Sequence, residues 1–194
     1  MEHRIRIIAG TARGRWIYSP SDTATRPMLV RIRNSLFNII RPHLAGAKVL
    51  DLFAGTGVLG LEALSRGAAF CLFTEQHRPS WQILTRNVER LGFKAQAQVI
   101  PQDAFGIAEV LKRESFTPDI IFVSPPYKFF DDDAPERARL LNLLDKLVPE
   151  RLVAPDGLIV VEHLSEQLAD WTPDYLTLSD RRTYGQTSLT FLKD

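Results

Sequence analysis

From residue 48 onward, short apolar runs alternate with segments in which apolar residues recur at helical spacing. The apolar runs predict strands over 49–53, 70–74, 97–100, 120–123 and 157–162. The segments between them predict helices over 60–66, 79–91, 104–113 and 135–147. Strands that are apolar throughout and alternate with helices are typical of a parallel α/β sheet covered on both faces. Two further runs, 175–178 and 187–191, lie either side of a turn at Gly185, which predicts an antiparallel hairpin at the end of the chain.

The first 48 residues follow a different pattern. Runs at 5–9 and 15–18 flank a glycine-containing turn and predict a short hairpin, and residues 29–40 predict an amphipathic helix. This part carries nine Arg and Lys against two acidic residues, a net charge of +7, whereas the rest sums to −6. A polyanionic partner is one interpretation, and a solvated basic face is the other. We expect residues 1–45 to form a basic extension and residues 46–194 to form the second domain.

Composition excludes several classes of protein. The 194 residues suit one domain, and no apolar run approaches the roughly 20 residues that span a bilayer. The N-terminus lacks the apolar core of a signal peptide, and the single Cys71 cannot form an internal disulfide. The four histidines are scattered, without the pair spacing of a zinc site. We therefore expect a cytoplasmic monomer with no membrane segment and no metal.

A glycine-rich loop follows the run at 49–53. Gly55, Gly57 and Gly60 satisfy G-x-G-x-x-G between a strand and a helix, a weak indication of nucleotide binding whose alternative is a tight, closely packed turn. A dinucleotide would place its pyrophosphate at the helix N-terminus. Asp51, just before the loop, would repel that anion. The acid instead favours a ligand with amine and sulfonium cations, S-adenosyl-L-methionine, over a nicotinamide dinucleotide.

Two more acids follow the next two predicted strands. Glu75 is placed to accept hydrogen bonds from ribose hydroxyls, and Asp103 from an adenine amine, although Asp103 also suits a helix N-cap. Because the ends of parallel strands meet at one edge of a sheet, we expect these acids near the loop. The expected cofactor-binding residues are Asp51, Phe53, Ala54, Gly55, Thr56, Gly57, Glu75, Asp103 and Ala104.

A Ser-Pro-Pro-Tyr segment, residues 124–127, ends the run at 120–123. The two prolines fix the backbone, which predicts a rigid lip at the end of the strand. The Tyr127 ring would stack on a base, and Ser124 with the Pro125 carbonyl would accept hydrogen bonds from an exocyclic amine. A stiff turn with a packed tyrosine is the simpler alternative. The candidate catalytic residues are Ser124, Pro125, Pro126 and Tyr127.

Nearly the whole chain resembles the RsmD-type family of bacterial small-subunit rRNA guanine-N2 methyltransferases. The resemblance is carried by Arg6-Ile7-Ile8-Ala9-Gly10, Arg26-Pro27, Arg31-Ile32-Arg33-Asn34-Ser35-Leu36-Phe37-Asn38, Asp51-Leu52-Phe53-Ala54-Gly55-Thr56-Gly57 and Tyr184-Gly185-Gln186-Thr187. It implies a Rossmann-like class I methyltransferase fold with a mostly parallel seven-stranded sheet. It also implies S-adenosyl-L-methionine as cofactor and a guanine in 16S rRNA, or in the small-subunit assembly, as target.

The resemblance gives the basic extension a partner. Structured RNA would be held through phosphate contacts from Arg13, Arg15, Arg26, Arg31 and Arg33. One departure concerns the target: the family usually has Asp or Asn where this chain has Ser124. Two alternatives therefore stay open, methylation of another base amine in DNA or RNA, and a catalytically impaired protein that binds cofactor and RNA.

Overall fold

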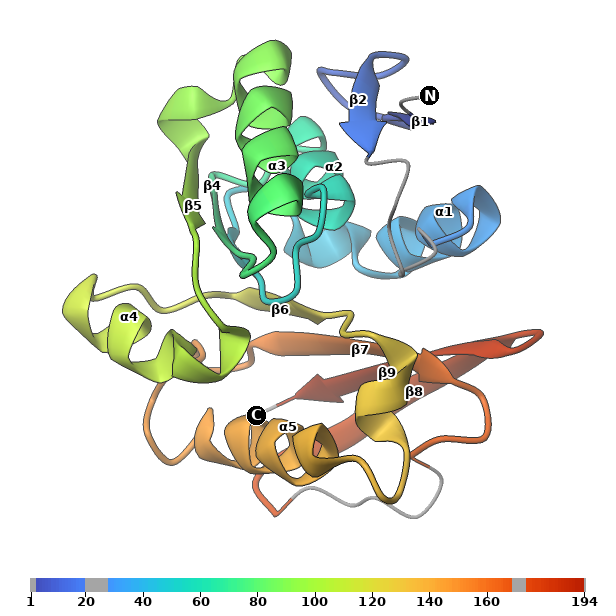
Figure 1. Ribbon diagram of the computed structural model, residues 1–194, viewed down its shortest axis with the longest axis vertical. Helices are drawn as coiled ribbons and strands as arrows, with labels where there is room; N and C mark the ends of the chain where they lie inside the picture. The colour runs from blue at the N-terminus through green and yellow to red at the C-terminus, as the bar shows by residue number, and fades with distance from the viewer. Residues whose placement is uncertain (1–2, 20–27, 169–173, 194) are drawn as a thin grey trace. The chain divides into compact units, whose positions relative to one another are not determined.

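The computed structural model describes residues 3–19, 28–168 and 174–193 (Figure 1). The chain divides into two compact units, Met1–Ala104 and Phe105–Asp194. The expected catalytic segment lies in the second unit, and the expected cofactor residues lie in the first. This division is distinct from the expected boundary after residue 45, which stays a prediction.

The first unit opens with the predicted hairpin. Strands β1 (His3–Arg6) and β2 (Trp16–Ser19) pair antiparallel, with Ile5 opposite Ile17. Helix α1 (Val30–Ile39) and the 3-10 turn η1 (Arg41–His43) follow. Helix α1 buries Ile32, Leu36 and Phe37, the spacing of one helical face, which confirms the predicted amphipathic helix.

Strands and helices then alternate as expected. The order is β3 (Lys48–Asp51), α2 (Val58–Ser65), β4 (Phe70–Thr74), α3 (Arg78–Leu91), η2 (Lys94–Gln96) and β5 (Ala97–Ile100). Strand β4 pairs in parallel with both β3 and β5. The carboxyl ends of these strands therefore lie at one edge of this part of the sheet, where parallel sheets bind ligands.

The second unit continues the same pattern and ends in a hairpin. Its elements are α4 (Ile107–Arg113), β6 (Ile120–Val123), η4 (Tyr127–Phe130), α5 (Pro135–Lys146), β7 (Leu158–Leu164), β8 (Thr177–Tyr184) and β9 (Thr187–Lys193). Strand β7 pairs in parallel with β6 and antiparallel with β9, and β9 pairs antiparallel with β8. This confirms the predicted C-terminal hairpin.

Several predicted boundaries are wrong: β1, for example, is His3–Arg6 rather than 5–9, and β3 is Lys48–Asp51 rather than 49–53. Two further differences change the character of an element. The run at 104–113 is divided between η3 (Ala104–Gly106) and α4, which begins only at Ile107. Strand β8 runs from Thr177 to Tyr184, not over 175–178, and therefore includes Asp180 and its charged neighbours. Most of β8 is exposed, so pairing with β9 rather than apolar burial places its polar residues in the sheet. No helix within the described ranges is long and apolar enough to cross a membrane.

Candidate active site

The glycine loop leads from the end of β3 into α2. Gly55 and Gly57 have φ of +55° and +82°, a region that side chains rarely adopt. A Cβ atom on Gly57 would lie 2.2 Å from the Leu84 side chain, and one on Gly60 would lie 2.2 Å from the Phe73 ring. Close packing therefore explains these two glycines. A Cβ on Gly55 would meet nothing within 4 Å, so the loop is open beside Gly55.

Asp51 carries a buried carboxyl group at the start of this loop. Its Oδ2 accepts a hydrogen bond from the Gly60 amide at 3.0 Å. Burial raises the pKa of Asp51 to about 7, opposed by the Gly60 hydrogen bond and assisted by the charge of Glu75. A nearby cation stabilises the ionised form of such an acid. The site therefore fits the positively charged end of S-adenosyl-L-methionine.

Glu75 follows β4 and contacts the same loop. Its Oε2 accepts a hydrogen bond from the Gly55 amide at 2.8 Å, and its Oε1 accepts one from the His77 amide at 2.7 Å. Each carboxylate oxygen has a second lone pair, so Glu75 can hold the loop and still accept from a ligand hydroxyl. The structure thus brings Glu75 and the glycine loop together, as the sequence predicts.

The other expected cofactor residues lie along this loop and after β5. The Ala54 amide donates to the Thr74 carbonyl at 3.0 Å, and the Thr56 carbonyl accepts from the Asn87 side chain at 3.1 Å. Phe53 is half-buried beside them. Asp103, also half-buried, and Ala104, which is buried and opens η3, follow β5. Asn87 was missed by sequence reasoning because it lies on a predicted helix, far along the chain from the loop.

In the second unit, the Ser-Pro-Pro-Tyr segment directly follows buried β6 and leads into η4. Pro125 is buried, whereas Ser124, Pro126 and Tyr127 are half-buried. The Tyr127 hydroxyl donates to Glu162 Oε1 at 3.1 Å and lies 3.4 Å from Thr187 Oγ1. These contacts fix the tyrosine ring from its hydroxyl end.

Glu162 is a residue that sequence reasoning did not single out. It lies on β7, is 7% exposed, and accepts side-chain hydrogen bonds from both Ser124 and Tyr127. Burial raises its pKa, and these two hydrogen bonds oppose the shift. The available signal was an acid near the end of an apolar strand, the same signal that marks Asp51.

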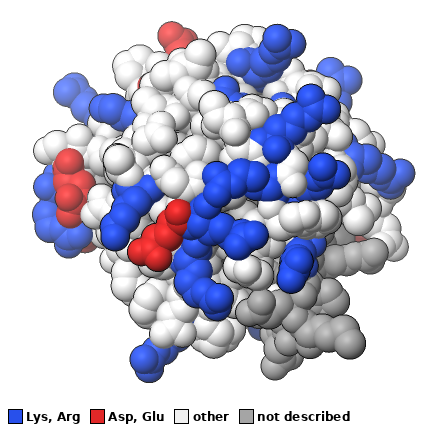
Figure 2. Space-filling model, turned by 90° about the horizontal axis from the view of Figure 1, so that it is seen from above, with Lys and Arg blue, Asp and Glu red and all other residues white. Residues whose placement is uncertain are grey.

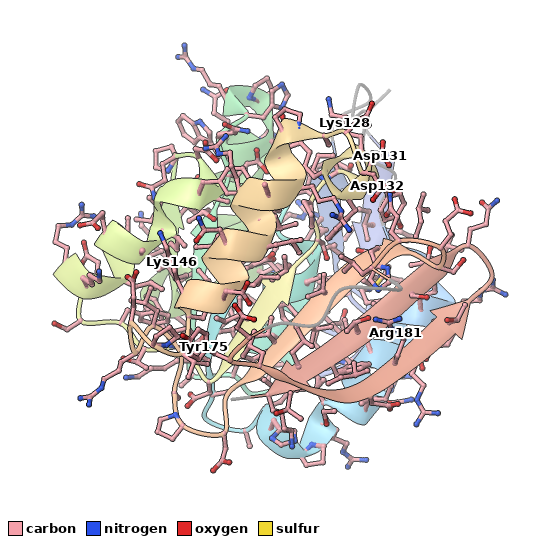
Figure 3. All side chains as sticks on the ribbon, turned by 90° about the horizontal axis from the view of Figure 1, so that it is seen from below. Lys128, Asp131, Asp132, Lys146, Tyr175 and Arg181 are labelled. Carbon is pink, nitrogen blue, oxygen red and sulfur yellow. The ribbon has the colours of Figure 1, made fainter. Side chains whose placement is uncertain are left out.

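The turn that follows Tyr127 is held to the segment after β7. Gln167 Nε2 donates to the Tyr127 carbonyl at 3.0 Å and to Asp131 Oδ1 at 2.9 Å. Figure 3 shows Lys128, Asp131 and Asp132 grouped around this turn, away from Lys146 on α5. Hydrogen bonds to the Tyr127 hydroxyl and to the Tyr127 carbonyl therefore both hold the Ser-Pro-Pro-Tyr segment in place.

The basic residues of the first unit differ in exposure. Arg13, Arg15 and Arg31 are exposed, and Arg15 donates to the carbonyls of Leu91, at 3.0 Å, and Arg90. Figure 2 shows basic side chains spread over the face that includes β1, β2 and α3, with few acidic ones among them. Arg26 lies outside the described residues.

Arg33 corrects the prediction of an RNA contact. Its side chain is completely buried, donates to the Arg6 carbonyl at 2.7 Å, and lies 3.9 Å from the buried carboxylate of Glu62. Burial lowers its pKa, and Glu62 opposes this shift. A guanidinium enclosed in this way does not reach a phosphate, so Arg33 is a structural residue.

Within the described ranges, no group of three or more His, Cys, Asp or Glu residues is arranged to hold a metal ion. Cys71 is buried in β4, and burial raises its thiol pKa well above the ordinary value. Neither finding adds a metal or a nucleophile to the candidate site.

Comparison with known proteins extends over nearly the whole chain. The family described as Conserved hypothetical protein 95 matches residues 5–193. The Bacillus subtilis protein named "Putative rRNA methyltransferase YlbH" is 35% identical over 190 residues, 97% of this chain and 98% of that protein. Ribosomal RNA small subunit methyltransferase D of Escherichia coli strain K12 is 34% identical over 185 residues, 95% of this chain and 87% of that protein.

A solved structure extends the likeness to three dimensions. The structure described as "Putative methyltransferase yhhF from Escherichia coli" is 32% identical, with a TM-score of 0.80 over 98% of both chains. This confirms the α/β class I methyltransferase fold, whose seven-stranded sheet is mostly parallel with antiparallel C-terminal strands. The chain therefore belongs to the RsmD and YlbH family, the family described as Conserved hypothetical protein 95.

Proposed function

We propose that this protein transfers a methyl group from S-adenosyl-L-methionine to the exocyclic N2 amine of a guanine in small-subunit (16S) ribosomal RNA. The observation that carries the proposal is the match over nearly the whole chain to a relative named ribosomal RNA small subunit methyltransferase D. The Ser-Pro-Pro-Tyr segment supports a base amine as the target, because the half-buried hydroxyl of Ser124 can accept a hydrogen bond from an N–H donor.

The first unit would bind the cofactor. Asp51 would attract the cationic methionine end, and Glu75 would accept hydrogen bonds from the ribose hydroxyls. The open side of the loop at Gly55 would allow the ligand to approach the backbone. Asp103, which follows β5, would accept a hydrogen bond from the adenine amine. When bound, the cofactor supplies a methyl group on a sulfonium, which is already a good leaving group.

The second unit would hold the base. Tyr127 would stack on the base ring, and its hydroxyl contacts would keep that ring in place. The Ser124 hydroxyl and the Pro125 carbonyl would accept the amine hydrogens and direct the nitrogen lone pair outward. Alignment of this kind accelerates a transfer by removing the entropic cost of orientation.

The basic extension, residues 1–45, would hold the RNA. Arg13, Arg15 and Arg31 are the exposed arginines of this part for which we propose phosphate contacts. Such contacts position RNA without reading its sequence, so the choice of nucleotide would depend on RNA shape and on the base site.

The test is incubation of the protein with labelled S-adenosyl-L-methionine and small-subunit rRNA, with and without bound ribosomal proteins. Nucleoside mass spectrometry then identifies the product. Guanosine methylated at N2 is the expected outcome. A methyl group on another base, or on DNA oligomers but not RNA, would replace the proposed target with another base amine.

Ser124 gives a specific reason to keep a second candidate, a protein that binds cofactor and RNA without turnover. A hydroxyl is a weaker acceptor for an amine than a carboxylate is. This candidate requires S-adenosylhomocysteine to bind, seen as a rise in melting temperature, while no nucleoside gains a methyl group.

A further inference from the structure

The side chains expected to hold the target base converge on one buried acid. Glu162 on β7 accepts a hydrogen bond from the Tyr127 hydroxyl at 3.1 Å. Ser124 lies beside Glu162, because Val123 at the end of β6 pairs with Val161 on β7, and the Ser124 hydroxyl also donates to the Glu162 carboxylate. A buried carboxylate with satisfied hydrogen bonds is a strong local acceptor, because few waters compete for it. One residue therefore determines the direction of both hydroxyl protons.

The direction of the Ser124 proton decides what Ser124 can do. A free serine hydroxyl rotates, and presents either its proton or a lone pair to an incoming group. When the proton is donated to Glu162, only lone pairs remain for a ligand. Donation to a carboxylate also strengthens the serine oxygen as an acceptor, because hydrogen bonds in a chain polarise one another.

We infer that Glu162 is a positioning residue for the proposed methyl transfer, taking the Ser124 proton so that the Ser124 oxygen accepts a hydrogen bond from the target amine. The inference rests on the proposed function. Glu162 is only 7% exposed whereas Ser124 is half-buried, so Ser124 is the more accessible to the base. Ser124 after β6 and Glu162 on β7 would together provide the hydrogen-bond acceptor for the amine. In the RsmD-type family a single Asp or Asn usually occupies the position of Ser124.

The first test compares E162Q with D145N. Asp145 on α5 is also a partly buried acid of this unit, and its Oδ1 accepts from the Asp174 amide at 3.2 Å. We expect E162Q to lower kcat about 10- to 100-fold without changing KM for S-adenosyl-L-methionine, and D145N to retain wild-type kcat. Wild-type kcat in E162Q, or an equal loss in D145N, would overturn the inference.

The second test asks whether an acid at position 124 replaces the pair. In S124D alone, two carboxyl groups are forced together and one must stay protonated, so activity is expected below wild type. In S124D/E162Q, the glutamine amide can donate to the new carboxylate, and kcat should recover at least tenfold over E162Q. A purely structural Glu162 predicts that S124D has the same effect in both backgrounds.

A binding measurement separates failure of this inference from failure of the proposed function. Guanosine 5′-monophosphate and inosine 5′-monophosphate differ only in the N2 amine, and nuclear magnetic resonance can titrate each against the protein with S-adenosylhomocysteine present. We expect wild type to favour the guanosine nucleotide, and E162Q to lose that preference. If E162Q loses the preference for guanosine 5′-monophosphate while the wild-type protein methylates no RNA, the role of Glu162 stands and only the proposed reaction is refuted. If wild type and E162Q prefer guanosine 5′-monophosphate to the same degree, the role of Glu162 is refuted and the proposed reaction is not affected.

Discussion

The side-chain amide of Asn87 on α3 donates a hydrogen bond to the Thr56 carbonyl of the glycine loop at 3.1 Å. The same amide donates to the Tyr18 carbonyl at 2.9 Å, and its oxygen accepts from the Tyr18 amide at 2.8 Å. One buried side chain thus joins β2, in the N-terminal hairpin of β1 and β2, to the loop proposed to hold the cofactor. The proposed RNA-binding and cofactor-binding parts therefore share a structural support.

Replacing Asn87 with alanine should weaken both stability and cofactor binding. The change removes the partners of two Tyr18 backbone groups and one Thr56 carbonyl, and we expect a loss of about 2–4 kcal/mol in the free energy of unfolding. Chemical denaturation measures that loss, and calorimetry should show weaker S-adenosylhomocysteine binding. Q82A on the exposed part of α3 is the matched control, expected to change neither. Unchanged ligand affinity in N87A would show that Asn87 does not support the loop.

Arg31 and Arg33, two positions apart on α1, should behave oppositely toward RNA. Arg31 is exposed, so R31A is expected to weaken RNA binding. The slope of the logarithm of the binding constant against the logarithm of salt concentration should become less steep by about 1. R33M should leave that slope unchanged, because Arg33 is buried. Filter binding across salt concentrations checks both expectations. A reduced slope in R33M would restore Arg33 as a phosphate contact.

R33M should also reduce stability, but only moderately. Arg33 Nε and Nη1 are buried without hydrogen-bond partners in the described structure, so burial of this charge carries a cost that methionine removes. The substitution also leaves the buried Glu62 carboxylate with Arg66 as its ion-pair partner, and it loses the hydrogen bond to the Arg6 carbonyl. We therefore expect the free energy of unfolding to fall by about 1–3 kcal/mol, because Arg66 still neutralises Glu62. A larger loss would mean that Arg33 is needed to neutralise Glu62.

Most strands could be predicted because each apolar run is bounded by polar or turn residues. Strands β4, β5 and β6 have the predicted bounds. Strand β8 could not be placed in this way, because its exposed side chains carry no apolar pattern and its pairing with β9 defines it. Strand burial is visible in the sequence, whereas strand pairing is not.

The candidate site shows the same limit. Asp51 and Glu75 could be predicted, since both follow apolar strands directly. Arg33 was assigned to the surface by residue type, but Glu62, 29 positions later, makes its burial possible. Glu162 was missed because its role depends on contacts with Ser124 and Tyr127, which only the folded chain brings to it.

Gly10 should tolerate no side chain. The residue has φ of +81°, and a Cβ there would lie 1.6 Å from the backbone oxygen of Ser65 on α2. We expect G10A to cost more than about 3 kcal/mol and to displace the basic hairpin from α2. Gly46 gives the control, because it has φ of +74° with nothing within 4 Å of a Cβ, and G46A should cost about 1 kcal/mol. Similar losses in both variants, measured by urea denaturation, would mean that backbone conformation alone matters.

Asp51 should couple cofactor binding to pH. Its pKa of about 7 in the ligand-free protein means that the carboxyl group is protonated at pH 6 and ionised at pH 8. Because the ionised form attracts the cationic ligand, affinity for S-adenosyl-L-methionine should rise between these two values. D51N keeps an oxygen for the Gly60 amide but no charge, so its affinity should be lower at pH 8 and depend less on pH. Calorimetric titration at both pH values measures this difference, and an equal pH dependence in D51N and wild type would assign it to another group.

The same substitution should stabilise the ligand-free protein. An acid whose pKa is higher in the folded state than in the unfolded state stabilises the fold below its unfolded pKa, and that contribution is lost as pH rises toward the folded value. For Asp51 the loss falls between pH 3.8 and about 7. We therefore expect D51N to raise the melting temperature more at pH 8 than at pH 5. A uniform rise at both pH values would show that the gain does not come from the buried charge.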